Sequence, residues 1–176
     1  VLARPGAPSR EAESGFLRDT LAGRGLEIVQ LEPPATLDGG DVLRIGRRLY
    51  VGASSRTNAA GIAGLDVWAR RDGLEVVAVP LGQCLHLKTA VTALDDDTIL
   101  VNPAWVDPAA FLARRVIQVD PQEAFAANVL RIGATLLANQ AFPRTRERIE
   151  AHARAGGLQV VAVDIPEFGK AEAGLT

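Results

Sequence analysis

The sequence has little of what several classes of protein require. Aromatic residues make up 5% of the 176 residues and the net charge is −2, so the stacking side chains and basic surface of a nucleic-acid-binding protein are not expected. No apolar run approaches the roughly 18 residues that a membrane-spanning helix needs, so no membrane span is expected. A single cysteine cannot form an internal disulfide, which fits a reducing compartment and favours a cytoplasmic location.

What is present is an ordinary globular composition. Hydrophobic residues account for 48% of the chain and charged residues for 23%, and a chain of this length can bury a core. We therefore expect residues 1–176 to form a single domain. No secretion signal is recognisable, but the chain opens on Val1 and runs at once into a proline-containing segment, so the natural N-terminus is expected upstream.

Local patterns predict alternating helices and strands. Ser9 can cap a helix over residues 9–22, with Gly23 as its stop signal. The other predicted elements are strands at residues 26–31, 42–45, 49–51, 74–79, 87–94 and 116–119, and helices at residues 56–71 and from residue 143 onward.

One arrangement of elements recurs along the chain. The segments that close a helix and open a strand are GLEIV at 25–29, GLEVV at 73–77 and GLQVV at 157–161. Arginine stands near the start of each preceding helix, at Arg10, Arg56 and Arg144. A fourth, shorter unit is predicted at residues 102–119. Repeated units of strand, strand, helix and strand predict modules packed around an axis; an ordinary α/β sheet, whose units also end in glycine and a β-branched strand, is the alternative.

Three polar residues occupy places where structure alone gives them little to do. Asp38 and Asp41 flank two glycines that would let the backbone approach a ligand closely, and His86 is expected at a strand start between leucines. A carboxylate and a histidine presented toward one axis would provide an orienting group and a general acid/base. The alternatives are aspartates that cap their own turn and a core histidine with one satisfied hydrogen bond.

Arginine at a helix start is disfavoured by the helix dipole. Arg10 and Arg56 are both predicted at such positions, which indicates an anionic ligand group, such as a carboxylate, that arginine binds through two hydrogen bonds. A surface arginine that points into solvent is the alternative for each. Arg144 has the third such position, but its charged neighbours are typical of a solvated helix face.

Cys84 and His152 are not expected to take part in chemistry. Cys84 lies two residues before His86, so in an extended strand their side chains would be roughly 6.5 Å apart, too far for direct proton transfer. Cys84 is therefore predicted to be a small buried hydrophobe. His152 lies among charged residues of a predicted helix, which predicts a surface position.

Six motifs, in this order, resemble those of the dimethylarginine dimethylaminohydrolases. They are RPGAPSR at residues 4–10, LDGGDV at 37–42, RTN at 56–58, LHLKT at 85–89, AAN at 126–128 and GLT at 174–176. Each motif alone is weak, but together they extend over essentially the whole chain. The resemblance implies the pentein fold, an α/β propeller of five pseudo-symmetric units around a central site, and the chain is expected to hold the last four units.

The resemblance also implies roles for particular residues. His86 matches the family's general acid/base, and Asp38 matches the acidic residue that orients it. The positions that match substrate contacts are Arg10, Arg56 and Ala171. The family's nucleophile is a cysteine that would follow directly after Thr176, where the sequence ends, and the carboxylates that hold the guanidinium are expected upstream. The 176-residue chain is therefore expected to be inert and the intact protein active.

The activity implied by the resemblance is hydrolysis of Nω,Nω-dimethyl-L-arginine, or its monomethyl form, to L-citrulline and dimethylamine or methylamine. A cysteine thiolate would attack the guanidinium carbon. His86 would protonate the departing amine and then deprotonate the water that hydrolyses the thiouronium. No metal or organic cofactor is implied, the partner is a small methylated arginine, and homo-oligomer formation stays open. Arginine metabolism and nitric oxide regulation would be the setting.

Three alternatives stay open beside this one. Arginine deiminases carry aspartate at the position of Lys88, so Lys88 argues against that activity. An amidinotransferase would differ only in using a second amine in place of water. A non-catalytic pentein that binds a translation partner has no use for an Asp38–His86 pair beside carboxylate-binding arginines. The residue after Thr176 would separate a binding module from the enzymes.

Overall fold

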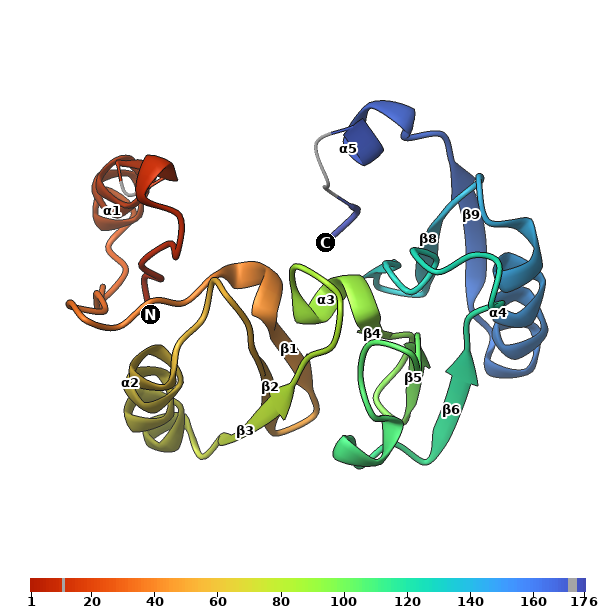
Figure 1. Ribbon diagram of the computed structural model, residues 1–176, viewed down its shortest axis with the longest axis horizontal. Coiled ribbons are helices and arrows are strands. Elements are labelled where there is room, and N and C mark those ends of the chain that lie inside the picture. Colours follow the sequence, from red (N-terminus) through yellow and green to blue (C-terminus); the bar gives the residue numbers. More distant parts are fainter. Residues whose placement is uncertain (11, 171–173) are drawn as a thin grey trace. The chain divides into compact units, whose positions relative to one another are not determined.

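The computed structural model describes residues 1–10, 12–170 and 174–176. The described chain divides into two compact units, one made of residues 1–81 and 85–87 and the other of residues 82–84 and 88–176. Figure 1 shows the order of the helices and strands. No helix in the described part of the chain has the length and apolar character required to cross a bilayer.

The first unit contains one three-stranded sheet. Its elements are the 3₁₀ turn η1 (Pro8–Arg10), α1 (Glu13–Ala22), η2 (Gly39–Asp41), β1 (Val42–Ile45), β2 (Arg48–Ala53), α2 (Ala59–Ala69), η3 (Arg70–Asp72) and β3 (Glu75–Pro80). β1 and β2 pair antiparallel, and β3 joins β2 in parallel. The short connection therefore makes a hairpin, and the connection through α2 makes a crossover.

Local sequence explains where these elements turn. Gly46, with a φ of +55°, supplies the left-handed conformation of the two-residue turn between β1 and β2. Asn58 caps α2, because its side-chain oxygen accepts the Gly61 N–H at 2.8 Å. Gly73 follows η3 in the left-handed conformation, with a φ of +64°.

The second unit contains two further sheets of the same plan. The first set of elements is α3 (Leu87–Ala90), whose first residue belongs to the first unit, β4 (Val91–Ala93), β5 (Thr98–Val101), η4 (Pro108–Ala110) and β6 (Arg115–Gln118). The second set is β7 (Leu130–Ile132), β8 (Thr135–Asn139), α4 (Pro143–Gly156), β9 (Gln159–Val163) and α5 (Pro166–Lys170).

Among the described residues, three sheets repeat one topology. In each sheet an antiparallel pair is followed by a strand that joins the second strand in parallel, in the orders β1-β2-β3, β4-β5-β6 and β7-β8-β9. The crossover contains a full helix in the first and third sheets and the single turn η4 in the second. The predicted repeat of strand, strand, helix and strand is confirmed in the first and third sheets, and in the second sheet a 3₁₀ turn takes the place of the helix.

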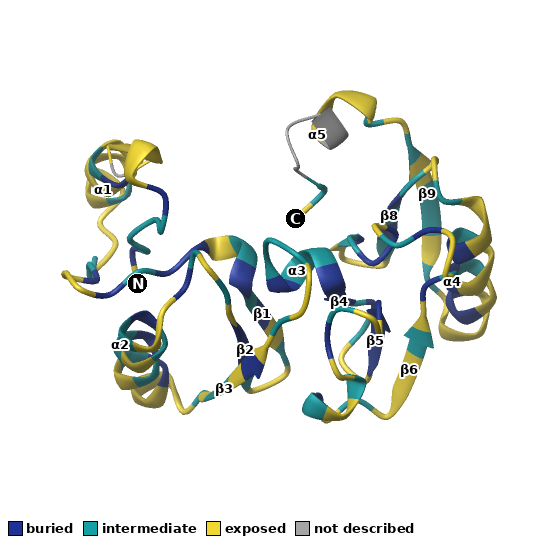
Figure 2. Ribbon diagram, viewed as in Figure 1, coloured by how far each residue is buried: buried dark blue, intermediate teal, exposed yellow. Residues whose placement is uncertain are grey.

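Each unit has its own apolar core. In the first unit, buried residues of the extended segments, β2 and α2 pack together: Leu31, Ala35, Leu37, Val51 and Leu65. In the second unit, the larger core draws on β5, β8 and α4, among other elements, and includes Leu94, Leu100, Val129, Leu136 and Ile149. β5 is buried along its whole length (Figure 2). Burial of these apolar side chains is the main favourable contribution to folding of each unit.

The N-terminal elements differ from prediction. Ser9 does not cap a helix, because it lies inside η1, which the Arg10 N–H closes onto the Ala7 carbonyl at 3.0 Å. α1 begins only at Glu13, and Ala12 before it offers no side-chain cap. Residues 26–31 do not form a full strand, because a strand needs a partner along its length; in the described chain they contribute to a single parallel bridge.

The segment predicted as a strand over residues 87–94 begins as a helical turn. The Leu87 N–H donates to Oδ1 of Asp41 at 3.0 Å, so it is not available to a sheet, and β4 starts only at Val91. His86 therefore precedes a helical turn rather than a strand. Residues 102–119 do not form a unit of their own either, because β6 completes the sheet begun by β4 and β5.

Candidate active site

The turn at residues 38–41 holds two buried carboxylates. The Asp41 N–H closes η2 onto the Asp38 carbonyl at 3.0 Å, and 5% of Asp38 and 0% of Asp41 is exposed. The Asp38 side chain does not cap the turn, and that of Asp41 bonds to residues at least 13 positions away. The alternative in which these aspartates merely cap their own turn is therefore wrong.

His86 and Asp38 form the centre of the site. Nε2 of His86 lies 3.0 Å from Oδ2 of Asp38, while Oδ1 of Asp38 accepts the Gly6 N–H at 2.9 Å. An ionised carboxylate can only accept hydrogen bonds, so Nε2 carries the proton in this contact. A neutral His86 then has its lone pair on Nδ1, which has no hydrogen-bond partner among the described residues. The ring can exchange a proton at Nδ1 while Asp38 holds its orientation.

Arg10 lies beside this pair. Its Nη1 is 3.8 Å from Oδ2 of Asp38, and its Nε and Nη2 donate to the Glu13 carboxylate at distances between 2.9 and 3.2 Å. The hydrogen bonds and charge of Glu13 raise the pKa of Arg10, and the same contact lowers the pKa of Glu13. A ligand carboxylate could use this face of the guanidinium only by displacing Glu13.

Arg56 lies in the same unit but has no hydrogen bond or ion pair to His86 or Asp38. Its backbone N–H donates to Oγ of Ser54 at 3.0 Å, and its backbone packs against Gly6, where a Cβ would overlap with the Arg56 carbonyl. The Arg56 guanidinium makes no hydrogen bond or ion pair with a described residue. Its binding role stays a prediction.

Both arginines precede their helices rather than opening them. Arg10 ends η1, three residues before α1, and Arg56 lies two residues before Asn58, the N-cap of α2. The argument from an unfavourable helix dipole therefore does not apply to either residue, since the dipole effect is confined to the first turn. The hydrogen-bonding capacity of the two guanidinium groups is what supports a carboxylate partner.

Two hydroxyl residues that sequence reasoning did not single out brace the buried carboxylates. Oδ2 of Asp41 accepts from Oγ of Ser54 and from Oγ1 of Thr57, each at 2.6 Å. Thr57 Oγ1 in turn accepts the Asp38 N–H at 3.0 Å. The available signal was two hydroxyl side chains shortly before a helix N-cap, a position where Ser and Thr bond to nearby backbone.

The remaining candidates belong to the second unit or lie outside the described residues. Cys84 is half-buried in a loop without strand residues, so the extended spacing considered for Cys84 and His86 does not apply. Arg144 bonds to Gln122 and lies 3.7 Å from Asp120, with 59% of its side chain exposed. Ala171 lies outside the described residues.

The surface position predicted for His152 is wrong. Only 9% of His152 is exposed; its Nε2 lies 2.7 Å from Oδ2 of Asp95 and its Nδ1 lies 3.1 Å from Nη1 of Arg115. Because arginine only donates, Nδ1 accepts and Nε2–H donates to Asp95. The spacing of Thr145, Ile149 and His152, at i, i+4 and i+7, marks the buried face of α4 and was the signal that could have found it.

Asn128, which belongs to the motif AAN, bonds to residues of two further motifs within the second unit. Its Oδ1 accepts the N–H groups of Leu175 and Thr176 at 2.6 and 3.2 Å, and its Nδ2 donates to Oγ1 of Thr176 at 2.7 Å and to the Lys88 carbonyl at 2.9 Å. Gly174 packs so closely on the amide that a Cβ there would overlap with it. The amide of Asn128 therefore holds the segment 174–176 in place.

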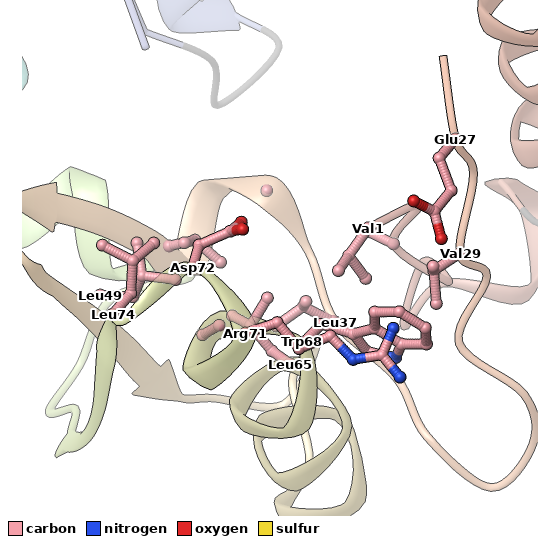
Figure 3. A pocket seen from close by; sticks show the side chains of 14 residues that line it. Val1, Glu27, Val29, Leu37, Leu49, Leu65, Trp68, Arg71, Asp72 and Leu74 are labelled. Atoms are coloured by element: carbon pink, nitrogen blue, oxygen red, sulfur yellow. The ribbon is translucent and has the colours of Figure 1, made fainter.

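A cavity of about 610 Å³ lies in the first unit, separate from the His86–Asp38 pair. Figure 3 shows Val1, Glu27 and Val29 on one side of it and Leu65, Trp68 and Arg71 of α2 and η3 opposite. The Arg71 guanidinium lies 3.7 Å from the centre of the Trp68 ring, a cation–π contact. None of the residues assigned to the pair lines this cavity.

The chain is similar to one family model over most of its length and to curated relatives over all of it. The family model described as "Arginine deiminase" matches residues 21–163. A protein of Streptomyces coelicolor named N(G),N(G)-dimethylarginine dimethylaminohydrolase is 42% identical over all of this chain and 66% of its own length. This chain therefore spans a little less than two thirds of that relative.

Solved structures give the same result. The chain superposes on a cysteine-to-serine mutant of the Pseudomonas aeruginosa enzyme complexed with citrulline, with a TM-score of 0.85 and 30% identity, covering 98% of this chain and 66% of that one. For ArgZ, a cyanobacterial arginine dihydrolase, the TM-score is 0.80 at 22% identity, covering 98% of this chain and 29% of that one, a likeness of fold alone. The pentein fold implied by the sequence motifs is confirmed.

Proposed function

Because this chain belongs to the dimethylarginine dimethylaminohydrolases within the arginine deiminase family, we propose that it forms part of a hydrolase acting on methylated arginine. Nω,Nω-dimethyl-L-arginine and water would yield L-citrulline and dimethylamine, and the monomethyl form would yield methylamine. The observation that carries the proposal is the Asp38 carboxylate, buried and 3.0 Å from Nε2 of His86, with Arg10 beside it.

The proposed chemistry needs a thiolate and a proton carrier. A cysteine, expected to follow Thr176, attacks the guanidinium carbon as thiolate. The protonated His86 then gives a proton to the dimethylamine nitrogen as its bond to that carbon breaks, which leaves a thiouronium. Water adds to the same carbon and loses a proton to His86. The carbon–sulfur bond then breaks, releasing citrulline and restoring the thiolate.

The pair suits this alternation. Asp38 accepts from Nε2, so the proton that is exchanged sits on Nδ1, and the imidazolium formed in one half of the cycle is stabilised by the carboxylate. Positioned acid/base catalysis of this kind contributes about 10²- to 10⁴-fold to a rate. A histidine with a purely structural role would not require the further hydrogen bonds that hold Asp38, from the Gly6 N–H and to Thr57.

Substrate contacts form the second part of the proposal. Arg10 and Arg56 would bind the α-carboxylate and neighbouring groups, since arginine binds carboxylates through two parallel hydrogen bonds. Ala171 would also contact the substrate. The Pseudomonas aeruginosa relative has been solved with citrulline, and a histidine-to-glycine variant of a dimethylarginine dimethylaminohydrolase has been solved as an adduct with S-methyl-L-thiocitrulline. Both ligands carry the amino-acid part that these arginines would bind. Cytoplasmic arginine metabolism and nitric oxide regulation would be the setting.

Arginine deiminase activity is the second candidate. It is favoured by the matching family model of that name and would release ammonia from arginine. Lys88 argues against it, because deiminases carry an aspartate there that binds the unsubstituted guanidinium. An ammonium side chain at this position cannot bind the same cationic group.

The test uses the open reading frame that encodes this chain, expressed from start codon to stop codon. Dimethylamine and citrulline are measured with asymmetric dimethylarginine as substrate, and ammonia with arginine. His86→Gly should lower dimethylamine release by at least about 10²-fold, whereas His152→Gln, a matched loss of the other histidine, should leave the rate per folded molecule unchanged. Ammonia release from arginine alone would assign deiminase activity. A folded protein that turns over neither substrate would contradict both.

A further inference from the structure

We propose that Asp41 is a positioning residue for the His86–Asp38 pair, acting on both members through separate hydrogen bonds. Oδ1 accepts the N–H of Leu87, the residue directly after His86, at 3.0 Å. Oδ2 accepts from Oγ1 of Thr57, which accepts the N–H of Asp38. The expected effect of these hydrogen bonds on catalysis rests on the proposed function, whereas the hydrogen bonds themselves do not.

The carboxylate of Asp41 lies in an unusual environment. It is fully buried, and its partners among the described residues are two hydroxyl groups and one backbone N–H, with no cation in contact. A buried carboxylate is costly unless several hydrogen bonds satisfy it. Three hydrogen bonds do so here, and two of them connect Asp41 to the pair, one through Leu87 and the other through Thr57.

The direction of each hydrogen bond is determined by chemistry. Thr57 Oγ1 accepts the Asp38 N–H, so its single proton is available for Asp41. Ser54 Oγ accepts the N–H groups of Arg56 and Thr57 at 3.0 and 3.2 Å and gives its proton to Asp41 at 2.6 Å. All three donors point at Asp41, so only an ionised carboxylate matches them.

The second unit contains a similar hydrogen-bonded turn, but its carboxylate has different partners. There Thr145 Oγ1 accepts the Asp120 N–H at 2.9 Å, as Thr57 does for Asp38, and Glu123 stands where Asp41 does. Glu123, however, accepts the backbone N–H groups of Arg144 and Thr145 at 3.0 and 2.7 Å. Both oxygens of Glu123 thus accept hydrogen bonds from N–H groups at the start of α4.

In the first unit a serine performs that task. The corresponding N–H groups, of Arg56 and Thr57, bond to Ser54. Because Ser54 replaces the carboxylate as the acceptor of these N–H groups, Oδ1 of Asp41 can accept the Leu87 N–H, 46 positions along the chain. The two units thus differ in what the carboxylate holds. Glu123 stabilises the start of a helix, whereas Asp41 bonds to the segment that follows His86.

Steric contacts support the same conclusion. A Cβ on Gly52 would lie 2.9 Å from Oδ1 of Asp41 and 3.0 Å from Cβ of Leu87, both tighter than ordinary contact. Gly52 in β2 therefore leaves just enough room for the carboxylate to meet the segment after His86. No larger residue could stand there without moving one of them.

The test compares Asp41→Asn, Thr57→Val and Thr57→Ser with Thr145→Val as the matched control, all in the complete open reading frame. Asparagine has one oxygen where three donors converge, and valine removes the hydroxyl that accepts the Asp38 N–H. We expect kcat for asymmetric dimethylarginine to fall roughly tenfold to a hundredfold in both, the scale for a slightly misplaced catalytic group, with KM nearly unchanged. Thr57→Ser keeps the hydroxyl and should restore kcat.

A second readout separates positioning from mere stability. The NMR signals of the His86 ring nitrogens can be assigned because they disappear in His86→Gly. They should show a proton on Nε2 in the wild type and a mixture of tautomers in Asp41→Asn and Thr57→Val. Thr145→Val should lower thermal stability without affecting kcat or the ring signals.

Wild-type kcat and ring signals in folded Asp41→Asn and Thr57→Val would overturn the proposal. If Asp41→Asn does not fold, the Thr57 variants decide the question alone. A wild type that turns over no methylated arginine defeats the proposed function, and the ring signals then still decide whether Asp41 positions His86.

Discussion

Gly40 packs directly against the imidazole of His86. A Cβ built on Gly40 would lie 2.7 Å from Cγ and 3.0 Å from Nδ1 of that ring, whereas one on Gly39 would meet nothing within 4 Å. The two neighbouring glycines of η2 therefore serve different purposes. Gly40 leaves room for the ring that Asp38 orients, and the backbone of Gly39 faces open space.

Alanine at these two positions should separate the effects. Gly40→Ala must push the ring away from Asp38, and we expect kcat to fall by roughly tenfold or more, as for a misplaced catalytic group. Gly39→Ala should retain activity, because the added methyl group displaces no atom. Steady-state kinetics on the complete protein compare them, and equal activity of the two variants would contradict the close packing.

Asp38→Asn should lower kcat strongly while leaving the fold intact. The amide has a single oxygen, so it cannot accept both the Gly6 N–H and the Nε2–H of His86 as the carboxylate does. We expect a loss of about 10²-fold or more. In the double variant with His86→Gly, the loss should match that of His86→Gly alone, since the two residues act as a unit. Additive losses would show independent roles.

Glu13→Gln should strengthen substrate binding. The Glu13 carboxylate bonds to Nε and Nη2 of Arg10, the groups proposed to bind the substrate carboxylate. A glutamine competes less well, so KM should fall by a few-fold, the scale of an exposed ion pair, with kcat unchanged. Asp19→Asn, at an exposed position on the same helix, is the control. A KM that rises in Glu13→Gln would show that Glu13 supports Arg10 rather than competing for it.

The Asp95–His152 pair should make stability depend on pH in acid. Burial by itself would raise the pKa of Asp95, but hydrogen bonds from the Asp97 N–H, Thr98 and His152 outweigh it, and the pKa is lowered overall. A lowered pKa contributes stability above the unfolded value of about 3.9, and this contribution is lost as the pH falls through the folded value.

Thermal unfolding of Asp95→Asn and wild type between pH 7 and pH 3 measures this effect. The wild type should be the more stable protein near neutral pH, and the difference should shrink as the pH falls below about 4, where the carboxyl group is protonated. Asp96→Asn, at a neighbouring position with 90% of its side chain exposed, should show little difference at any pH. A constant difference in Asp95→Asn would mean that only packing is lost.

Asn128→Leu should release the segment 174–176. Leucine keeps much of the volume but removes every hydrogen bond from the amide to Leu175 and Thr176. Their backbone N–H groups should exchange with solvent at least about tenfold faster. Asn139→Leu, which removes the bond to the Ala141 N–H, should leave this exchange unchanged, and protection retained in Asn128→Leu would refute the role of the amide.

Elements defined by neighbouring residues were predictable from the sequence. The hairpin of β1 and β2 follows from apolar alternation on both sides of Gly46. The helix α4 begins at Pro143 and ends at Gly156, directly before Gly157 with its left-handed φ of +68°. The errors arose where a partner from elsewhere intervened. The Leu87 N–H is taken by Asp41 and leaves the sheet, and His152 is buried because Asp95 and Arg115 satisfy it.

The sequence by itself determined the repeat, the fold family and the residues worth testing, because glycine and arginine positions, strand periodicity and motif order are properties of the chain alone. Only the tertiary structure decided which of them meet. His86 reaches Asp38 across 48 positions and Leu87 reaches Asp41 across 46, and neither contact is encoded in local periodicity. Such contacts depend on how the turn before β1 and the segment after β3, which lie at the same end of the strands of the first sheet, come together. A few buried hydrogen bonds there select a single arrangement.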